Sequence, residues 1–280
     1  MTTTALAPEQ IARHAAVLAE SRDREALAAS ARALAASGQP EALEVLGRFL
    51  QEEVFLARLD ALEEPQQKLT NLRHVLAALQ AHPNRSTGRL CETLAGSPGF
   101  MAEPDRKIFL LPALAEVRPM SEAAEAIFRR ANAEGYWSSN GPLLMSNGSP
   151  RALSIFAEMV ADAGVPEADR VDMIHWAVPA HRLQPGVAEM ARGVLDRGMP
   201  PEVERALVET LFDYQGDEWF GVARNPPVPP PWAAGATGVL QHYLKLGEHL
   251  VKTRKPPPPL AKAIEATLHE IRAILATRPK

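Results

Sequence analysis

The sequence contains one cysteine and no long apolar run. With Cys91 alone, the 280-residue chain cannot form an internal disulfide, and the surrounding Arg-Leu-Cys-Glu-Thr-Leu pattern predicts a buried thiol on a helix. No apolar stretch approaches the roughly 18–20 residues of a membrane-spanning helix, so we predict no membrane association. The opening residues lack the basic and apolar regions of a secretory signal, and we therefore expect a cytoplasmic protein.

The charge is unevenly distributed along the chain. The formal net charge of −4 argues against general binding to nucleic acid, because contacts with phosphates supply most non-specific affinity. The net charge is −5 over 1–64, +2 over 65–150, −6 over 151–224 and +5 over 225–280. The basic tail could lie against the acidic segment before it, or both could be solvated surfaces. Arginine outnumbers lysine 23 to 7, and alanine is abundant, which indicates a GC-rich bacterial genome.

Helical spacing of apolar residues dominates the sequence. No stretch alternates apolar and polar residues with β-branched enrichment, so we predict no strand and an all-α fold. The predicted helices cover residues 9–20, 22–36, 40–62, 66–80, 87–95, 105–117, 122–134, 151–163, 167–178, 186–197, 202–214, 236–253 and 259–277.

Proline followed by an acidic residue recurs at the start of these helices. The pairs begin at residues 8, 40, 104, 166 and 201, so their intervals are close to one or two units of a period near 32 residues. Proline is tolerated at the first helical position, and an acid in that turn interacts favourably with the helix dipole. Short connections favour antiparallel neighbours, and a single helix pair cannot cover its own apolar stripe, so the pattern predicts a stack of helical hairpins.

One region resembles a HEAT-type repeat. KIFLLPALAEV (107–117) has Pro112 inside a Leu-rich helix and is followed by SEAAEAIFRRA (121–131), as in a unit whose kinked first helix precedes a straight second one. The resemblance implies a right-handed α-solenoid of antiparallel helix pairs. The aspartate and arginine that the family places between the two helices are not clearly placed here. The period near 32 is closer to the tetratricopeptide repeat, whose Trp, Gly, Tyr and Ala pattern is absent.

The composition of the chain changes after residue 214, and this change divides the sequence into three predicted segments. We predict a helical-repeat domain over 1–224, a proline-rich connector over 225–235 and a C-terminal helical hairpin over 236–280 that packs on or caps the repeats. The segment from Arg224 to Pro230 also matches a peptide ligand of SH3-like grooves, but a rigid connector is the preferred interpretation.

The aromatic residues suggest a binding surface. All the tryptophans and tyrosines lie between residues 136 and 243, and two clusters, over 135–141 and 212–221, have the composition of loops. Aromatic side chains in such loops are enriched at binding surfaces, although they could instead pack the loops onto their own repeats. The predicted binding residues are Tyr136, Trp137, Tyr214, Asp217, Trp219, Phe220, Arg224 and Trp232.

Catalytic and metal-binding patterns are missing from the sequence. His242 and His249 share a helix face but lie about 10 Å apart along the axis, too far to chelate one ion. No paired-cysteine or His-Glu-x-x-His motif, nucleophile elbow or phosphate-binding glycine loop occurs. We therefore predict no metal, no cofactor and no catalytic residue.

The leading hypothesis is a non-catalytic scaffold that binds a protein or peptide partner. One alternative is a DNA-binding enzyme of the alkylbase glycosylase type, a family with HEAT-like repeats, for which Asp172 and Trp176 would supply the carboxylate and the aromatic group. Arg151, Arg170 and Arg182 would then contribute the basic groove. A second alternative is a self-assembling regulatory subunit that dimerises through its C-terminal hairpin. The sequence does not identify the partner or the process.

Overall fold

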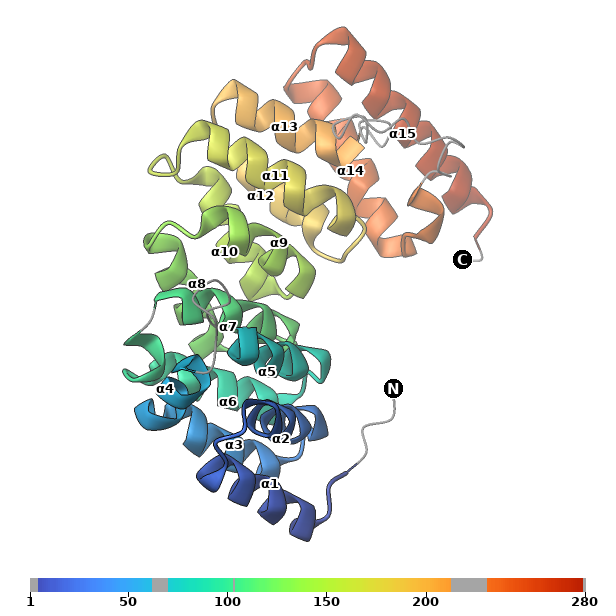
Figure 1. The fold of residues 1–280 in the computed structure, drawn as a ribbon. Helices are drawn as coiled ribbons and strands as arrows, with labels where there is room; N and C mark the ends of the chain where they lie inside the picture. The colour runs from blue at the N-terminus through green and yellow to red at the C-terminus, as the bar shows by residue number, and fades with distance from the viewer. Residues whose placement is uncertain (1–4, 62–69, 103, 213–230, 279–280) are drawn as a thin grey trace. The chain divides into compact units, whose positions relative to one another are not determined.

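The computed structural model describes residues 5–61, 70–102, 104–212 and 231–278. Within these ranges the chain forms fifteen α-helices and two 3₁₀ segments without a β-strand, which confirms the predicted all-α class (Figure 1). None of the helices there is both long enough and apolar enough to cross a bilayer. The chain divides into two compact units, the first ending at Ala131 and the second beginning at Asn132.

The first unit is built from two rows of helices. α2, α5 and α7 pack in succession as one row, α3 and α6 are neighbours in the other, and α1 packs against both α2 and α3. Leu27, Leu46 and Val75 are fully buried in its core. The elements are α1 (Pro8–Glu20), α2 (Arg24–Ser37), α3 (Pro40–Gln51), α4 (Glu53–Ala61), α5 (Thr70–Ala81), α6 (Arg85–Gly96), η1 (Phe100–Ala102), α7 (Pro104–Glu116) and α8 (Glu122–Ala133), whose last two residues pass the division.

The second unit has the same two-row construction. α9, α11 and α13 are successive neighbours in one row, α10, α12 and α14 in the other, and α15 packs on α13 and α14. Phe156, Ile174 and Leu207 lie in its core. The elements are α9 (Trp137–Asn147), α10 (Pro150–Ala161), α11 (Glu167–His181), α12 (Val187–Arg197), α13 (Pro201–Phe212), η3 (Pro231–Ala234), α14 (Thr237–Thr253) and α15 (Pro258–Ala276) (Figure 1).

The proline–acid pairs mark helix starts as predicted. Proline is the first residue of α1, α3, α7 and α13, and Pro166 is the N-cap of α11, with Glu167 in the first turn. The missing proline N–H falls where a helix has no acceptor for it, and the following acid lies near the positive end of the helix dipole. The sequence signal and the observed boundaries therefore agree at all five positions.

The single helix predicted over 40–62 is wrong, because the chain bends at Glu52. That residue is extended, with φ −83° and ψ 116°, and it separates α3 from α4. The apolar spacing nevertheless continues across the bend, where the Phe49 and Phe55 rings lie 5.4 Å apart. Apolar periodicity reports which side chains are buried, so it did not reveal the break in the backbone.

The loop predicted over 135–141 is also wrong, because α9 begins at Trp137. The helix packs mainly against α11 and α10. Gly141 permits the close approach to α11, since a Cβ atom there would lie 2.4 Å from Cγ of Met173. Tertiary packing therefore overrides a local composition of Gly, Ser and Asn that is typical of loops.

The C-terminal helices belong to the second compact unit. α14 packs along α12, and α15 packs against α13, so both helices extend the rows that precede them. The predicted domain boundary after residue 224 lies outside the described residues, as does most of the predicted connector.

Candidate functional site

The predicted binding residues fall into three groups in the structure. Five of them, Tyr214, Asp217, Trp219, Phe220 and Arg224, lie outside the described residues. Tyr136 and Trp137 stand at the start of α9, where Tyr136 is the N-cap, and both are half-buried. Because α9 packs against its neighbours, part of the aromatic surface of Tyr136 and Trp137 is buried and is not available to a partner.

Trp232 is fully buried, which corrects its assignment to a binding surface. It lies in η3, and its indole meets the Tyr243 ring at a centroid distance of 4.8 Å and an interplanar angle of 66°. Cζ of Arg182 lies 5.9 Å from the centroid of the indole. A large aromatic surface is most stable in such a core, so the residue stabilises the unit and presents no area to a partner.

A buried polar contact holds this aromatic cluster together. The Tyr243 hydroxyl donates a 2.6 Å hydrogen bond to the backbone carbonyl of Arg182. Burial raises the pKa of Tyr243, so the phenol stays protonated as the donor. The Thr267 hydroxyl donates to the Phe212 carbonyl at 2.9 Å, which ties α15 to the end of α13. Tyr243 and Thr267 are fully buried, so these hydrogen bonds stabilise the second unit.

Trp176, on α11, is the exposed large aromatic side chain among the described residues of the second unit. It is 62% exposed, whereas its helix neighbours Ala177 and Val178 are fully buried. Ala168, Asp172 and Ala180 are also exposed, and with Trp176 they follow one line along α11 at intervals of four residues. This line is opposite the apolar stripe of the helix, so its exposure follows from the helical period.

Acidic side chains share the exposed side of α11 with Trp176 and recur on the neighbouring helix α13. Asp169 and Asp172 share its side of α11, and the neighbouring helix α13 carries Glu202, Arg205 and Glu209 at the same three- and four-residue spacing. Arg205 Nε is 2.8 Å from Glu209 Oε1, with the Arg205 side chain 60% exposed. We call this surface, made of Asp169, Asp172, Trp176, Glu202, Arg205 and Glu209, the acidic–aromatic face.

His175 links the two helices of this face electrostatically. Burial lowers the pKa of His175, while the carboxylates of Glu209 and Asp172 oppose that shift. The imidazole is therefore neutral at neutral pH and adds no positive charge to the face. The carboxylates that act on His175 come from both α11 and α13, which are packed neighbours.

The arginines proposed for a DNA-binding groove do not form one. Arg170 and Arg182 are only 5% and 8% exposed, and each donates to a backbone carbonyl, of Val160 and Thr210 respectively. Arg151 is exposed, but it lies on α10, in the other row of helices. The expectation that these residues supply a basic surface beside Trp176 is thus wrong for Arg170 and Arg182.

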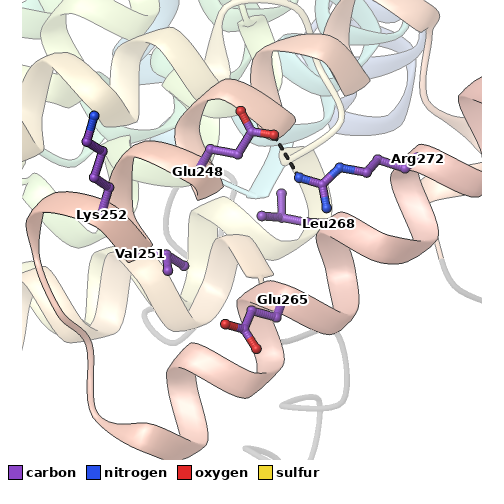
Figure 2. A pocket seen from close by; sticks show the side chains of 6 residues that line it. All are labelled: Glu248, Val251, Lys252, Glu265, Leu268 and Arg272. Carbon is purple, nitrogen blue, oxygen red and sulfur yellow. Dashed lines mark hydrogen bonds and ion pairs between the residues drawn. The ribbon is translucent and has the colours of Figure 1, made fainter.

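A shallow pocket of about 300 Å³ lies between α14 and α15 (Figure 2). One wall is an ion pair, with Glu248 Oε1 2.7 Å from Arg272 Nη2 and both side chains more than half exposed. Figure 2 shows the Lys252 ammonium directed away from Glu265, so charges of both signs are dispersed around a small apolar floor. The pocket is lined by Glu248, Val251, Lys252, Glu265, Leu268 and Arg272. We assign it no ligand.

The histidines of α14 pair with carboxylates of α12. His242 Nδ1 is 2.8 Å from Glu189 Oε1, and His249 Nε2 is 3.4 Å from Asp196 Oδ1. The partners are separated by seven residues on each helix and follow in the same order, so α12 and α14 run parallel. Among the described residues, no three His, Cys, Asp or Glu side chains are grouped so that they could hold a metal ion.

The helix predicted over 167–178 already places Asp172 and Trp176 four residues apart, whereas α11 continues past Pro179 to His181 and so brings Ala180 onto the same line. Comparison with protein-family models, with curated proteins and with solved structures found no match to this chain.

Proposed function

We propose that the protein is a non-catalytic interaction scaffold with the architecture of a right-handed, HEAT-like α-solenoid. The two-row packing within each compact unit supports this proposal, because successive helix pairs that cover one another's apolar stripes are the building principle of solenoids. Such stacks present extended helical surfaces to partners.

Internal prolines lend support to the HEAT-like assignment. Pro112, Pro142 and Pro179 lie inside α7, α9 and α11, which belong to the row α2, α5 and α7 of the first unit and the row α9, α11 and α13 of the second. An internal proline removes one backbone hydrogen bond and kinks the helix, as expected for the first helix of a HEAT-type unit. In the sequence, the resemblance to a HEAT-type unit rested on Pro112 alone of these three prolines.

The observation that carries the proposed function is the exposure of Trp176. A tryptophan that is 62% exposed leaves a large apolar area in water, and aromatic side chains at such positions are enriched at protein–protein interfaces. Val54, on α4, is also exposed but is aliphatic and offers a smaller apolar surface. We therefore assign the partner-binding surface to the acidic–aromatic face.

Site-specific photocrosslinking tests this assignment. Benzoylphenylalanine replaces Ala180, which is exposed one turn beyond Trp176, in cells that naturally contain the protein. We expect a crosslinked protein adduct that disappears when Trp176→Ala is introduced. The same crosslinker at Glu44, exposed on α3, is the matched control. An equal yield of adducts at the two positions, or adducts indifferent to Trp176, would contradict the assignment.

A further inference from the structure

We propose that the acidic–aromatic face binds an arginine-containing basic segment of its partner protein. This inference rests on the proposed function and adds the chemistry of the partner to it. It follows from three features of the face: the spacing of Asp172 and Trp176, the balance of charge around them, and the electrostatic state of His175.

The spacing of Asp172 and Trp176 suits a single guanidinium group. Side chains four residues apart on a helix have Cβ atoms roughly 6 Å apart. An arginine side chain can therefore lie over the exposed indole and donate hydrogen bonds to the Asp172 carboxylate at the same time. Asp172 and Trp176 are both exposed on one line of α11, so the contact with the guanidinium requires no movement of that helix.

The charge of the face is complementary to such a segment. The face carries four carboxylates and one guanidinium, and that guanidinium, of Arg205, is already bonded to Glu209. Asp172 therefore adds negative charge one turn from the indole, and Asp169 and Glu202 add more negative charge along the same face. The same charge repels phosphate groups, which disfavours nucleic acid and anionic lipid as occupants.

Arginine fits the face better than lysine does. The guanidinium is planar, stacks on an aromatic ring and can meet a carboxylate through two parallel hydrogen bonds, whereas an ammonium is a compact and strongly hydrated charge. His175, which is neutral at neutral pH, does not compete with the incoming cation. We thus expect arginine to be selected over an isosteric neutral side chain and over lysine.

Fluorescence anisotropy with labelled peptides tests the inference on the full chain. The probes are peptides of alternating glycine with arginine, lysine or citrulline, the last being a neutral isostere of arginine. We expect the arginine peptide to bind, and the citrulline peptide to bind at least about tenfold more weakly, since it loses the charge-assisted contacts. Trp176→Leu and Asp172→Asn should each weaken arginine-peptide binding about fivefold, while the control Glu44→Gln should leave it unchanged.

Several results would overturn the inference: no binding of the arginine peptide, equal binding of the citrulline peptide, or wild-type affinity in both face variants. If these occur while the crosslink at Ala180 still depends on Trp176, the scaffold function stands and only the partner chemistry is wrong. If the Trp176-dependent crosslink is also missing, both proposals fail. A gel shift of duplex DNA at low salt that depends on Trp176 would show that the face binds nucleic acid and would overturn the inference of a protein partner.

Discussion

Replacing Trp232 with alanine should destabilise the second unit far more than replacing Trp176 with alanine. A buried tryptophan removes about 150–250 Å² from water, which at about 25 cal/mol per Å² corresponds to about 4–6 kcal/mol. This is an upper bound, because the unfolded chain is not fully extended. Trp232 is fully buried against Tyr243 and Arg182. We therefore expect Trp232→Ala to lower the free energy of unfolding by about 4 kcal/mol.

The expected cost at Trp176 is much smaller. The side chain is 62% exposed, so folding withdraws roughly 80 Å² of it, worth about 2 kcal/mol at most. Alanine regains about 0.5 kcal/mol through its higher helix propensity on α11. Trp176→Ala should therefore lower the free energy of unfolding by no more than about 1.5 kcal/mol.

Urea unfolding followed by tryptophan fluorescence measures both values. All four tryptophans belong to the second unit, at positions 137, 176, 219 and 232, so three reporters remain in each variant. Trp232→Phe is an informative control, because it keeps an aromatic ring and removes an indole N–H that has no acceptor among the described residues. Its cost should be well below that of the alanine variant. Losses within about 1 kcal/mol of each other for the two alanine variants would refute the reasoning.

Three further predictions concern single positions. Burial lowers the pKa of His175 in the folded protein, so the unfolded chain binds a proton more readily, and the free energy of unfolding decreases as the pH drops below about 6.5. His175→Gln should therefore reduce the decrease in the urea midpoint between about pH 7.5 and 5.5. Burial raises the pKa of Cys91 to about 12, so at about pH 8 the thiol should react with Ellman's reagent only after the first unit unfolds. An immediate reaction of the folded protein would contradict the burial of Cys91. Gly141→Ala should destabilise the chain by about 1–3 kcal/mol through the contact with Met173, whereas Gly193→Ala, with open space around its Cβ position, should stabilise it by about 0.5–1 kcal/mol in thermal unfolding.

Helix starts could be predicted from the sequence because their signals are local. A proline followed by an acid fixes the first turn whatever the helix later packs against, and all five pairs lie at helix starts. The exposure of Trp176 was also predictable, since the line from Ala168 to Ala180 lies opposite the apolar stripe of α11. Its role as a binding residue was not predicted, because the denser aromatic clusters over 135–141 and 212–221 have the loop-like composition that is typical of binding surfaces.

The errors arose where distant residues decide the structure. Trp232 follows a proline-rich stretch, and nothing near it in the sequence reveals that Arg182, fifty residues earlier, and Tyr243 enclose it. Likewise α9 forms from a loop-like composition because α11 packs on it closely at Gly141. Local propensity is a weak prior that such packing readily outweighs.

The two His–carboxylate pairs between α12 and α14 favour one axial alignment of these parallel helices. Because Glu189 and Asp196 meet His242 and His249 at equal intervals, sliding α14 by one turn would break both contacts together. The two contacts therefore favour one alignment of α14 on α12, together with the buried hydrogen bonds of Tyr243 and Thr267. We therefore expect a change in the number of residues between α13 and α14 to leave both contacts in place.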